Sequence, residues 1–355
     1  MHSDRELVQF RSDGLGLSPA SYARLLAHLA ARPGIADDYS QGGAVAELEA
    51  RMAALLGTEA AVFMPSGTLA NHLALRTLAK GGRRVLVQQE SHLYNDEGDC
   101  AQQLSGLTLV PLAPGRASFT LTEAAAEIAG PAEARVAIPV GAISIETPVR
   151  RMAGAAFDFA EMRRIAADAR ERGIGLHLDG ARLLIEAVYT GIAPADYAAL
   201  FDTVYVSLYK YLNAAAGAIL AGPKALLDGL YHQRRMFGGG LPHVWPYAAV
   251  ALHYLDGFAE RFAAAAAASN KLLTALAEHP RVRVERGATN VSLIHLAGEG
   301  AAALPARLLA KDIAIRPPRE ISSAGATFAL HTNETILRRP IDETIRQFDA
   351  VLDGS

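Results

Sequence analysis

The chain has 355 residues, 51% hydrophobic and 20% charged, which is enough apolar material for two domains or for one large and one small domain. The formal net charge of −3 gives no basic excess that would favour nucleic acid or an anionic membrane as a partner. A single cysteine, Cys100, excludes a disulfide framework and argues against a zinc–thiolate site, and no apolar run is long enough to predict a transmembrane helix.

The first 40 residues are expected to form an N-terminal arm. Their opening, MHSDRELVQF, is charged and lacks the apolar region of a secretory signal, so we expect a soluble cytoplasmic protein. The rest of the arm is polar, with turn signals at SDG and RPG.

From residue 41 to residue 245 strands and helices alternate, which predicts a large domain. A first helix is expected over residues 43–56, with Gly57 as its C-cap and with one apolar face formed by Val45, Leu48, Met52 and Leu55. The strands are expected at residues 60–66, 83–88, 107–112, 135–146, 174–181, 201–208 and 217–222, and helices at residues 67–79 and 158–173. Near-continuously apolar strands separated by helices predict a parallel or mixed sheet that is covered on both faces.

Residues 246–355 are expected to form a small C-terminal α+β domain. A long Ala-rich helical segment over residues 245–279 leads into it. Short strands are expected at residues 282–286, 290–296, 313–317 and 327–331, followed by a last helix near residues 341–353.

Three motifs at strand ends carry candidate chemistry. In PSGTLAN, residues 65–71, a strand ends and Ser-Gly-Thr opens a helix, which suits either an ordinary N-cap or a phosphate site. In LHLDGARL, residues 176–183, Asp179 follows a buried strand and could meet Arg182 or a protonated ring nitrogen, and His177-x-Asp179 could also be part of a metal site.

The third motif is VYVSLYKYLNAAAGAIL, residues 204–220, in which Lys210 closely follows an apolar strand. Taken alone, this lysine is a snorkelling surface residue or a desolvated amine that can form a Schiff base. A phosphate anchor, a carboxylate and a lysine in this order are what pyridoxal phosphate needs. His92, just after the strand at residues 83–88, could stack on its ring or simply cap a helix.

These motifs resemble, nearly end to end, the L-threonine aldolase/β-eliminating lyase family. The strings that carry the resemblance are FRSDGLGLSP, DDYSQGGAVAELEARMAALLGTEAAVFMPSGTLAN, ESHLYNDEG, HLDGARL, SLYKYLNAAAGAILAG and RRMFGGG. The resemblance implies the fold-type I pyridoxal-phosphate transferase fold, with a mostly parallel seven-stranded sheet in the large domain and a small α+β C-terminal domain. It also implies homo-oligomers, usually dimer-based tetramers with shared active sites.

Carried over by position, the resemblance implies a role for each matching residue. Those implied for the cofactor are Ser66, Gly67 and Thr68 at the phosphate, His92 on the ring, Asp179 at the pyridine nitrogen, Arg182 near O3′, Lys210 as the Schiff-base amine and Arg235 near a neighbouring subunit's phosphate. Those implied for the amino-acid substrate are Ser12 at the carboxylate, Arg182 at the same carboxylate as the alternative to O3′, and Glu146 and Thr147 near the reacting face. No metal is implied.

The chain departs from the family pattern at several positions. Family aldolases commonly read Glu-Asn-Thr-His-Asn where this chain has ETPVRR, so Pro148 and Val149 stand near the place of the usual histidine. The C-terminal arginine that clamps the substrate carboxylate is replaced, and Arg316 or Arg319 could substitute for it. Tyr209 stands before the lysine, where a small residue is usual.

The sequence therefore predicts a threonine-aldolase-like carbon–carbon lyase that cleaves a β-hydroxy-α-amino acid to glycine and an aldehyde. The alternative keeps the cofactor but changes the reaction to β-elimination, racemisation or transamination. A third hypothesis, that this fold serves as a binding or regulatory module, has the presence of Lys210, Asp179 and His92 against it.

Overall fold

The computed structural model describes residues 7–132 and 135–354, so that residues 1–6 of the expected arm lie outside the described part. By their contacts in space, the described residues fall into two compact units, one of residues 30–253 and one of residues 7–29 with 254–354. We call these the large and the small unit and describe each by itself. Residues 7–29 thus group with the C-terminal residues, whereas we expected a separate arm up to residue 40.

The large unit is built on the expected seven-stranded sheet. Its strands are β2 (Ala60–Met64), β3 (Arg84–Gln88), β4 (Thr108–Leu112), β5 (Val140–Glu146), β6 (Gly175–Asp179), β7 (Thr203–Ser207) and β8 (Ala218–Gly222). They lie in the order β2-β8-β7-β6-β5-β3-β4. All neighbours pair in parallel except β8, which is antiparallel to both β2 and β7. The mostly parallel sheet is therefore confirmed.

The reversal at β8 has a local cause. Only residues 208–217 connect β7 to β8, and so short a connection lets the chain turn back but not cross over to a parallel neighbour. Because β8 is reversed, β2 runs in the same direction as β7 and ends at the same edge of the sheet. The carboxyl ends of β2, β3, β5, β6 and β7 therefore meet along one edge.

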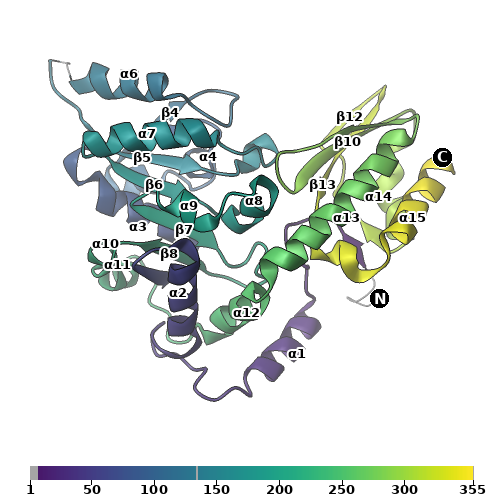
Figure 1. The fold of residues 1–355 in the computed structure, drawn as a ribbon, viewed down its shortest axis with the longest axis horizontal. Helices are drawn as coiled ribbons and strands as arrows, with labels where there is room; N and C mark the ends of the chain where they lie inside the picture. The colour runs from purple at the N-terminus through teal and green to yellow at the C-terminus, as the bar shows by residue number, and fades with distance from the viewer. Residues whose placement is uncertain (1–6, 133–134, 355) are drawn as a thin grey trace. The chain divides into compact units, whose positions relative to one another are not determined.

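Helices cover both faces of this sheet, since β5, β7 and β8 are buried at every residue. Figure 1 shows α3 (Gly67–Leu78) and α7 (Phe159–Glu171) on either side of β5 and β6 in the view drawn. The other helices of this unit are α2 (Gly43–Leu56), α4 (His92–Asn95), α5 (Cys100–Ser105), α6 (Leu121–Ala132), α8 (Leu183–Thr190), α9 (Pro194–Ala198), α10 (Lys224–Leu227), α11 (Leu230–Met236) and α12 (Trp245–Leu255), whose last two residues pass into the small unit.

Helix α2 has the predicted bounds, and Gly57 caps it in the left-handed conformation at φ 64°. One expected core residue is wrong. Leu55 is 37% exposed, and the neighbouring Leu56 is buried in its place. Both positions lie within one turn of Met52, so the helical period alone could not separate them.

Two expected elements are shorter than predicted. The strand expected over residues 135–146 begins only at Val140, and Val136 is 73% exposed, because Pro139 has no N–H to donate to a sheet ladder. The expected helical segment over residues 245–279 consists of two helices, α12 and α13 (Phe258–Glu278), which are separated at Gly257 with φ 62°.

The small unit is an α+β structure, as expected. Its antiparallel sheet has the order β12-β13-β10-β9, formed by β9 (Val282–Glu285), β10 (Val291–Ala297), β12 (Glu320–Ser322) and β13 (Gly325–His331). Helix α13 packs with α15 (Ile341–Asp353) around a core that includes Phe328 and Phe348, and α14 (Leu304–Leu309) joins them.

The described part of the expected arm is more ordered than its polar sequence predicted. Residues 19–29 form a helix, α1 (Pro19–Leu29), and β1 (Val8–Gln9) pairs in parallel with β11 (Ile313–Ala314). Only these two residues of the strand expected over residues 313–317 are in a sheet, because their partner strand is equally short.

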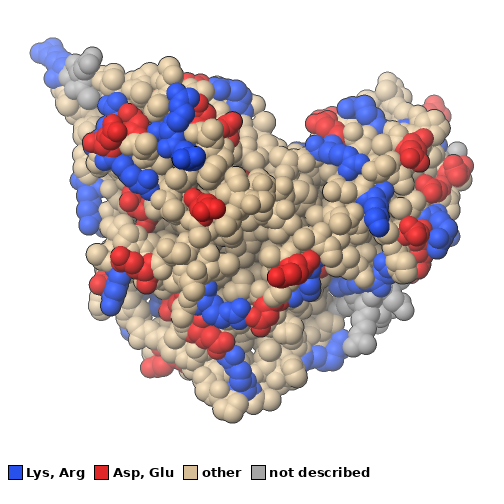
Figure 2. All heavy atoms as spheres, in the orientation of Figure 1, with Lys and Arg blue, Asp and Glu red and all other residues tan. Residues whose placement is uncertain are grey.

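The surface in Figure 2 carries acidic and basic side chains intermingled around α7. On α7, Arg164 lies 2.5 Å from Glu161 and Arg172 lies 2.8 Å from Asp168, each pair one turn apart. Within residues 7–132 and 135–354, no helix has the length and apolar character needed to cross a membrane.

The C-cap of α2 gives a first prediction. Gly57→Ala should lower the free energy of unfolding by about 1–2 kcal/mol, because an L side chain at φ 64° is strained, and its Cβ would also lie 3.3 Å from the Ala195 Cβ. Urea denaturation measures this loss. The matched control is Gly229→Ala at φ −86°, which should change stability by less than about 0.5 kcal/mol. Equal losses in both variants would contradict the conformational cause.

Candidate active site

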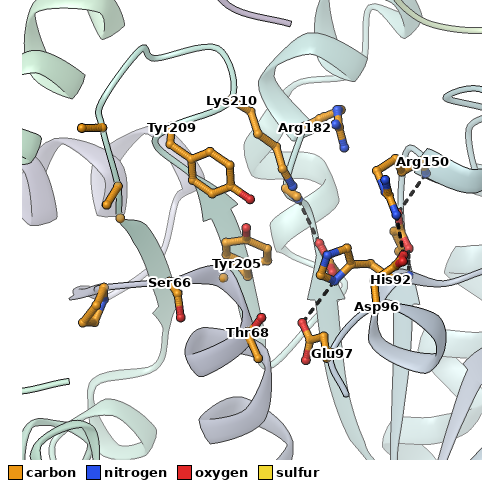
Figure 3. A pocket seen from close by; sticks show the side chains of 18 residues that line it. Ser66, Thr68, His92, Asp96, Glu97, Arg150, Arg182, Tyr205, Tyr209 and Lys210 are labelled. Atoms are coloured by element: carbon orange, nitrogen blue, oxygen red, sulfur yellow. Dashed lines mark hydrogen bonds and ion pairs between the residues drawn. The ribbon is translucent and has the colours of Figure 1, made fainter. Parts of the chain in front are cut away.

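A cavity of about 330 Å³ opens at the carboxyl edge of the large sheet. The structure brings eight of the sequence-predicted residues to its wall, from five different strand ends: Ser66, Gly67, Thr68, His92, Glu146, Asp179, Arg182 and Lys210. Asp96, Glu97, Arg150, Tyr205 and Tyr209 also line it. Figure 3 shows that Lys210 reaches toward the centre, with Ser66 and Thr68 on one side and His92 on the other.

The start of α3 forms one end of the cavity. Ser66 is an N-cap, since its hydroxyl accepts a hydrogen bond from the Leu69 N–H at 3.2 Å. The first amides of the helix follow at Gly67 and Thr68, where the helix dipole favours an anion. A Cβ at position 67 would lie 2.1 Å from the Tyr205 hydroxyl, so this close approach of helix and strand requires glycine.

Lys210 is in the β7–β8 connection, and its Nζ lies near two aromatic rings. It is 5.9 Å from the ring centroid of Tyr205 and 5.7 Å from that of Tyr209. Tyr205 is buried, whereas Tyr209 is 46% exposed. The amine therefore points into the cavity, which removes the snorkelling alternative that the isolated motif left open.

Asp179 is 3% exposed and ends β6. Its carboxylate accepts hydrogen bonds from the Asn71 Nδ2 at 2.9 Å and from the Ala181 N–H at 3.2 Å. The neighbouring His177 uses both ring nitrogens, one with Asn71 at 3.0 Å and one with Thr203 at 2.8 Å. Burial lowers the pKa of His177 to about 4, so the ring is neutral and has no free nitrogen for a metal.

His92 begins α4 and pairs with a carboxylate that the sequence did not single out. Its Nδ1 lies 3.3 Å from Glu97 Oε1, and that hydrogen bond raises the pKa of His92 above its usual range. Glu97 is 7% exposed, and burial raises the pKa of its carboxyl group. The only sequence signal was spacing, since Glu97 comes five residues after His92 in the loop beyond α4.

Glu146, at the end of β5, joins two loops beneath the cavity. Its carboxylate accepts the His92 N–H at 2.5 Å and the Arg150 N–H at 2.9 Å. Burial, and then the nearby Asp179 charge, raise the pKa of Glu146. Glu146 thus fixes the positions of His92 and Arg150 through their backbones.

Arg150 occupies the cavity wall in the segment where the chain departs from the family pattern. Its Nη2 lies 2.5 Å from Asp96, and Arg151 lies 3.5 Å from the same carboxylate. Val149 is fully buried, so Arg150 and not the residue before it faces the cavity. The sequence motifs predicted no role for Arg150.

Three of the sequence-predicted site residues are not on this wall. Arg235 is exposed on α11, and its guanidinium lies 5.1 Å from the ring centroid of Tyr39. Ser12 and Arg316 belong to the small unit, where Ser12 accepts a hydrogen bond from Gln9 and Arg316 donates one to the Arg11 carbonyl. Their expected roles stay predictions.

The donor set suits pyridoxal phosphate on physical grounds. Gly67 and Thr68 place the first amides of α3 on the cavity wall, and Lys210 supplies an amine. On the far wall Asp179 is a buried carboxylate close to Glu97 and Glu146, a surplus of negative charge that a protonated ring nitrogen would offset.

Comparison with known proteins gives a consistent result. The beta-eliminating lyase family matches residues 9–299. A low-specificity L-threonine aldolase of Candida albicans is 30% identical over 221 residues, 61% of this chain and 58% of that protein. The alanine racemase TOXG of Cochliobolus carbonum is 33% identical over 207 residues, 58% of this chain and 52% of that protein. The match thus spans little more than half the length of these curated relatives.

A solved structure extends the likeness to the whole chain. The putative L-allo-threonine aldolase from Listeria monocytogenes EGD-E has a TM-score of 0.83 at 26% identity and covers 99% of this chain and 97% of its own. The small α+β unit is therefore part of the shared architecture.

A buried glutamate behind the site gives a second prediction. Glu186 bonds Thr147 at 2.9 Å and Tyr197 at 3.2 Å, and burial raises its pKa to about 7 from the ordinary value of 4.5. A raised folded-state pKa means that its contribution to stability is complete below pH 4.5 and is lost as the pH rises through 7. Glu186→Gln should therefore match the unaltered protein at pH 4.5 and exceed it by about 3 kcal/mol at pH 8.

Urea denaturation at several pH values measures this difference. The control is Glu171→Gln, an exposed residue of α7, whose stability profile should run parallel to that of the unaltered protein. A constant gap between Glu186→Gln and the unaltered protein from pH 4.5 to pH 8 would contradict burial of a titrating carboxyl group.

Proposed function

The chain belongs to the beta-eliminating lyase family, and we propose that it is a pyridoxal-phosphate-dependent carbon–carbon lyase that cleaves a β-hydroxy-α-amino acid to glycine and an aldehyde. The observation that carries the proposal is the single cavity that gathers a helix N-terminus, a buried aspartate and a lysine. The aldolase names of its relatives favour this reaction within the family.

Each of these groups has a role in the proposal. Gly67 and Thr68 would hold the cofactor phosphate through the amides of α3, with the Ser66 hydroxyl beside them. Asp179 would face the pyridine nitrogen, and Lys210 would bind the cofactor covalently through Nζ. When bound, pyridoxal phosphate supplies an electron sink for the negative charge left at Cα as a bond to it breaks.

The cleavage also needs a base for the substrate hydroxyl. With Val149 buried in the segment where the family has its histidine, we propose His92, which lines the cavity and is held by Glu97. Proton removal by a positioned group contributes roughly 10²- to 10⁴-fold in rate. Glu146 would act by holding the His92 backbone in place.

We further propose that Ser12 and Arg316 bind the substrate carboxylate, together with Arg182. Arg235 is exposed beside the Gly238–Gly240 turn, and in a homo-oligomer it would approach the cofactor phosphate of a neighbouring subunit. These roles rest on the family pattern and on the exposure of Arg235.

A second candidate reaction has a specific observation in its favour. Arg150 lines the cavity in the segment that differs from the family pattern, so it brings a positive charge to the cavity there. β-Elimination, racemisation or transamination would use the same cofactor-binding residues. A relative named as an alanine racemase supports keeping this second candidate.

The third prediction concerns cofactor and reaction together. The purified protein should show a visible absorption band from covalently bound cofactor, and Lys210→Ala should lose that band because no other group would provide the covalent link. L-threonine, L-allo-threonine and phenylserine are assayed for aldehyde and glycine. A colourless protein that cannot be reconstituted would contradict the cofactor assignment. A yellow protein that gives no aldehyde, but gives pyruvate from serine, would favour β-elimination.

The fourth prediction concerns Tyr209. Because its ring lines the cavity 5.7 Å from Nζ of Lys210, Tyr209→Ser should change the ratio of kcat/KM for phenylserine over threonine by about tenfold or more. Tyr94→Ser, an exposed tyrosine that is not among the lining residues, is the control. An unchanged ratio in Tyr209→Ser would show that this ring does not shape the substrate pocket.

A further inference from the structure

The side chain of Asn71 lies at the junction of the site's charged groups. It is 1% exposed, on α3 one turn beyond Thr68. Its Nδ2 donates at 2.9 Å to Asp179 and at 2.9 Å to Glu97, and its Oδ1 lies 3.0 Å from His177 Nε2. The amide therefore uses both N–H groups and its carbonyl oxygen.

The chemistry of these partners leaves one orientation for the amide. Two carboxylates can only accept, so the NH₂ group must face Asp179 and Glu97. The carbonyl oxygen then needs a donor, which makes His177 carry its proton on Nε2. Its Nδ1 then accepts a hydrogen bond from the Thr203 hydroxyl at 2.8 Å. This bond completes the hydrogen-bond network and fixes the orientation of the Asn71 amide.

On its other side, the hydrogen-bond network extends from Asn71 through Glu97 to His92, which lines the cavity. Glu97 Oε1 accepts from Asn71 and also lies 3.3 Å from His92 Nδ1. Asp179 and Glu97 are both buried, and a buried carboxylate without a hydrogen-bond donor is strongly disfavoured in its charged form. One neutral amide thus donates a hydrogen bond to each of two buried carboxylates.

We propose that Asn71 is a positioning residue that couples Asp179 to the Glu97–His92 pair and stabilises the charged form of Glu97 that orients His92. The coupling deepens the proposed function, on which its catalytic meaning rests. An ionised Asp179 would hold a protonated ring nitrogen, and an ionised Glu97 orients His92 and raises its affinity for the proton that the proposed base removes. A single amide thereby links the back of the cavity to its side wall.

Other charged groups also face His92 and contribute to its pKa before any substitution is made. Asp179 and Glu97 favour its protonated form, whereas the Lys210 charge and burial oppose it. Glu146 binds its backbone N–H, and Asp96 and Arg150 pair with each other on the same wall. Of these groups only Asp179 and Glu97 bond Asn71, and of the two only Glu97 is hydrogen-bonded to the His92 ring, so most of a change in the pKa of His92 would travel through Glu97.

The readout is the proton affinity of His92, which needs no substrate. Deuterium exchange at the His92 C2 carbon, followed by mass spectrometry over a range of pH, gives the pKa of that one histidine in the full-length protein as purified and after removal of cofactor. Asn71→Leu has nearly the same volume but no donor, so Glu97 should bind a proton more readily. The pKa of His92 should then fall by about one pH unit.

A double-variant test distinguishes coupling from mere disturbance. Glu97→Gln should lower the pKa of His92 on its own, and Asn71→Leu should add much less in the Glu97→Gln background than in the unaltered protein, because only the weaker route through Asp179 remains. The matched control is Asn290→Leu in the small unit. Asn290 is also 1% exposed and donates to a carboxylate, that of Asp13, at 3.0 Å, yet its loss should leave His92 unchanged.

Two results would overturn the proposal. An unchanged pKa of His92 in a folded Asn71→Leu protein would show that the amide does not support Glu97. Additive effects of Asn71→Leu and Glu97→Gln would show that any change does not pass through Glu97. If Asn71→Leu does not fold, Asn71→Ala serves, with the same expected direction. Because no turnover is measured, these results are separate from any failure of the aldolase assignment.

Discussion

The site depends on a buried negative charge, the Asp179 carboxylate at the end of β6. Burying a charge is costly unless hydrogen bonds compensate, and here the compensation comes from Asn71 and the Ala181 amide. That requirement fixes α3, which carries Asn71, against the strand that carries Asp179. The same helix presents its first amides at the cavity, so the anion end and the carboxylate are held by one rigid element.

The motifs could be found from the sequence because each comes directly after a strand, and the carboxyl ends of parallel strands lie at one edge of the sheet. Ser66, Asp179 and Lys210 were predictable for that reason, before any contact was known. Asn71 and Glu97 were not, since a helical asparagine and a loop glutamate carry no pattern that separates a buried hydrogen bond from a solvated surface position. The two carboxylates that Asn71 binds, those of Asp179 and Glu97, are 108 and 26 residues away from it in the sequence.

The fold was predictable to the extent that its signals were local. The helical period and Gly57 gave α2 its bounds, but one turn of ambiguity misplaced Leu55. The helical segment over residues 245–279 contains a break at Gly257, which adopts a positive φ. The β1–β11 pair could not be expected, because two residues on each strand show no period and their pairing is decided by tertiary contacts.

The cluster of Asp179, Glu97 and Glu146 implies that the site is maintained at the expense of stability. Burial raises the pKa of both glutamates, which means that the folded protein holds them in an environment less favourable to charge than water. A ligand that brings positive charge to this wall binds only the folded state, so it would recover part of that cost. At a hundredfold excess over its Kd, such a ligand adds about 2.7 kcal/mol to stability. Selection for a cofactor can therefore retain a charge arrangement that selection for stability alone would remove.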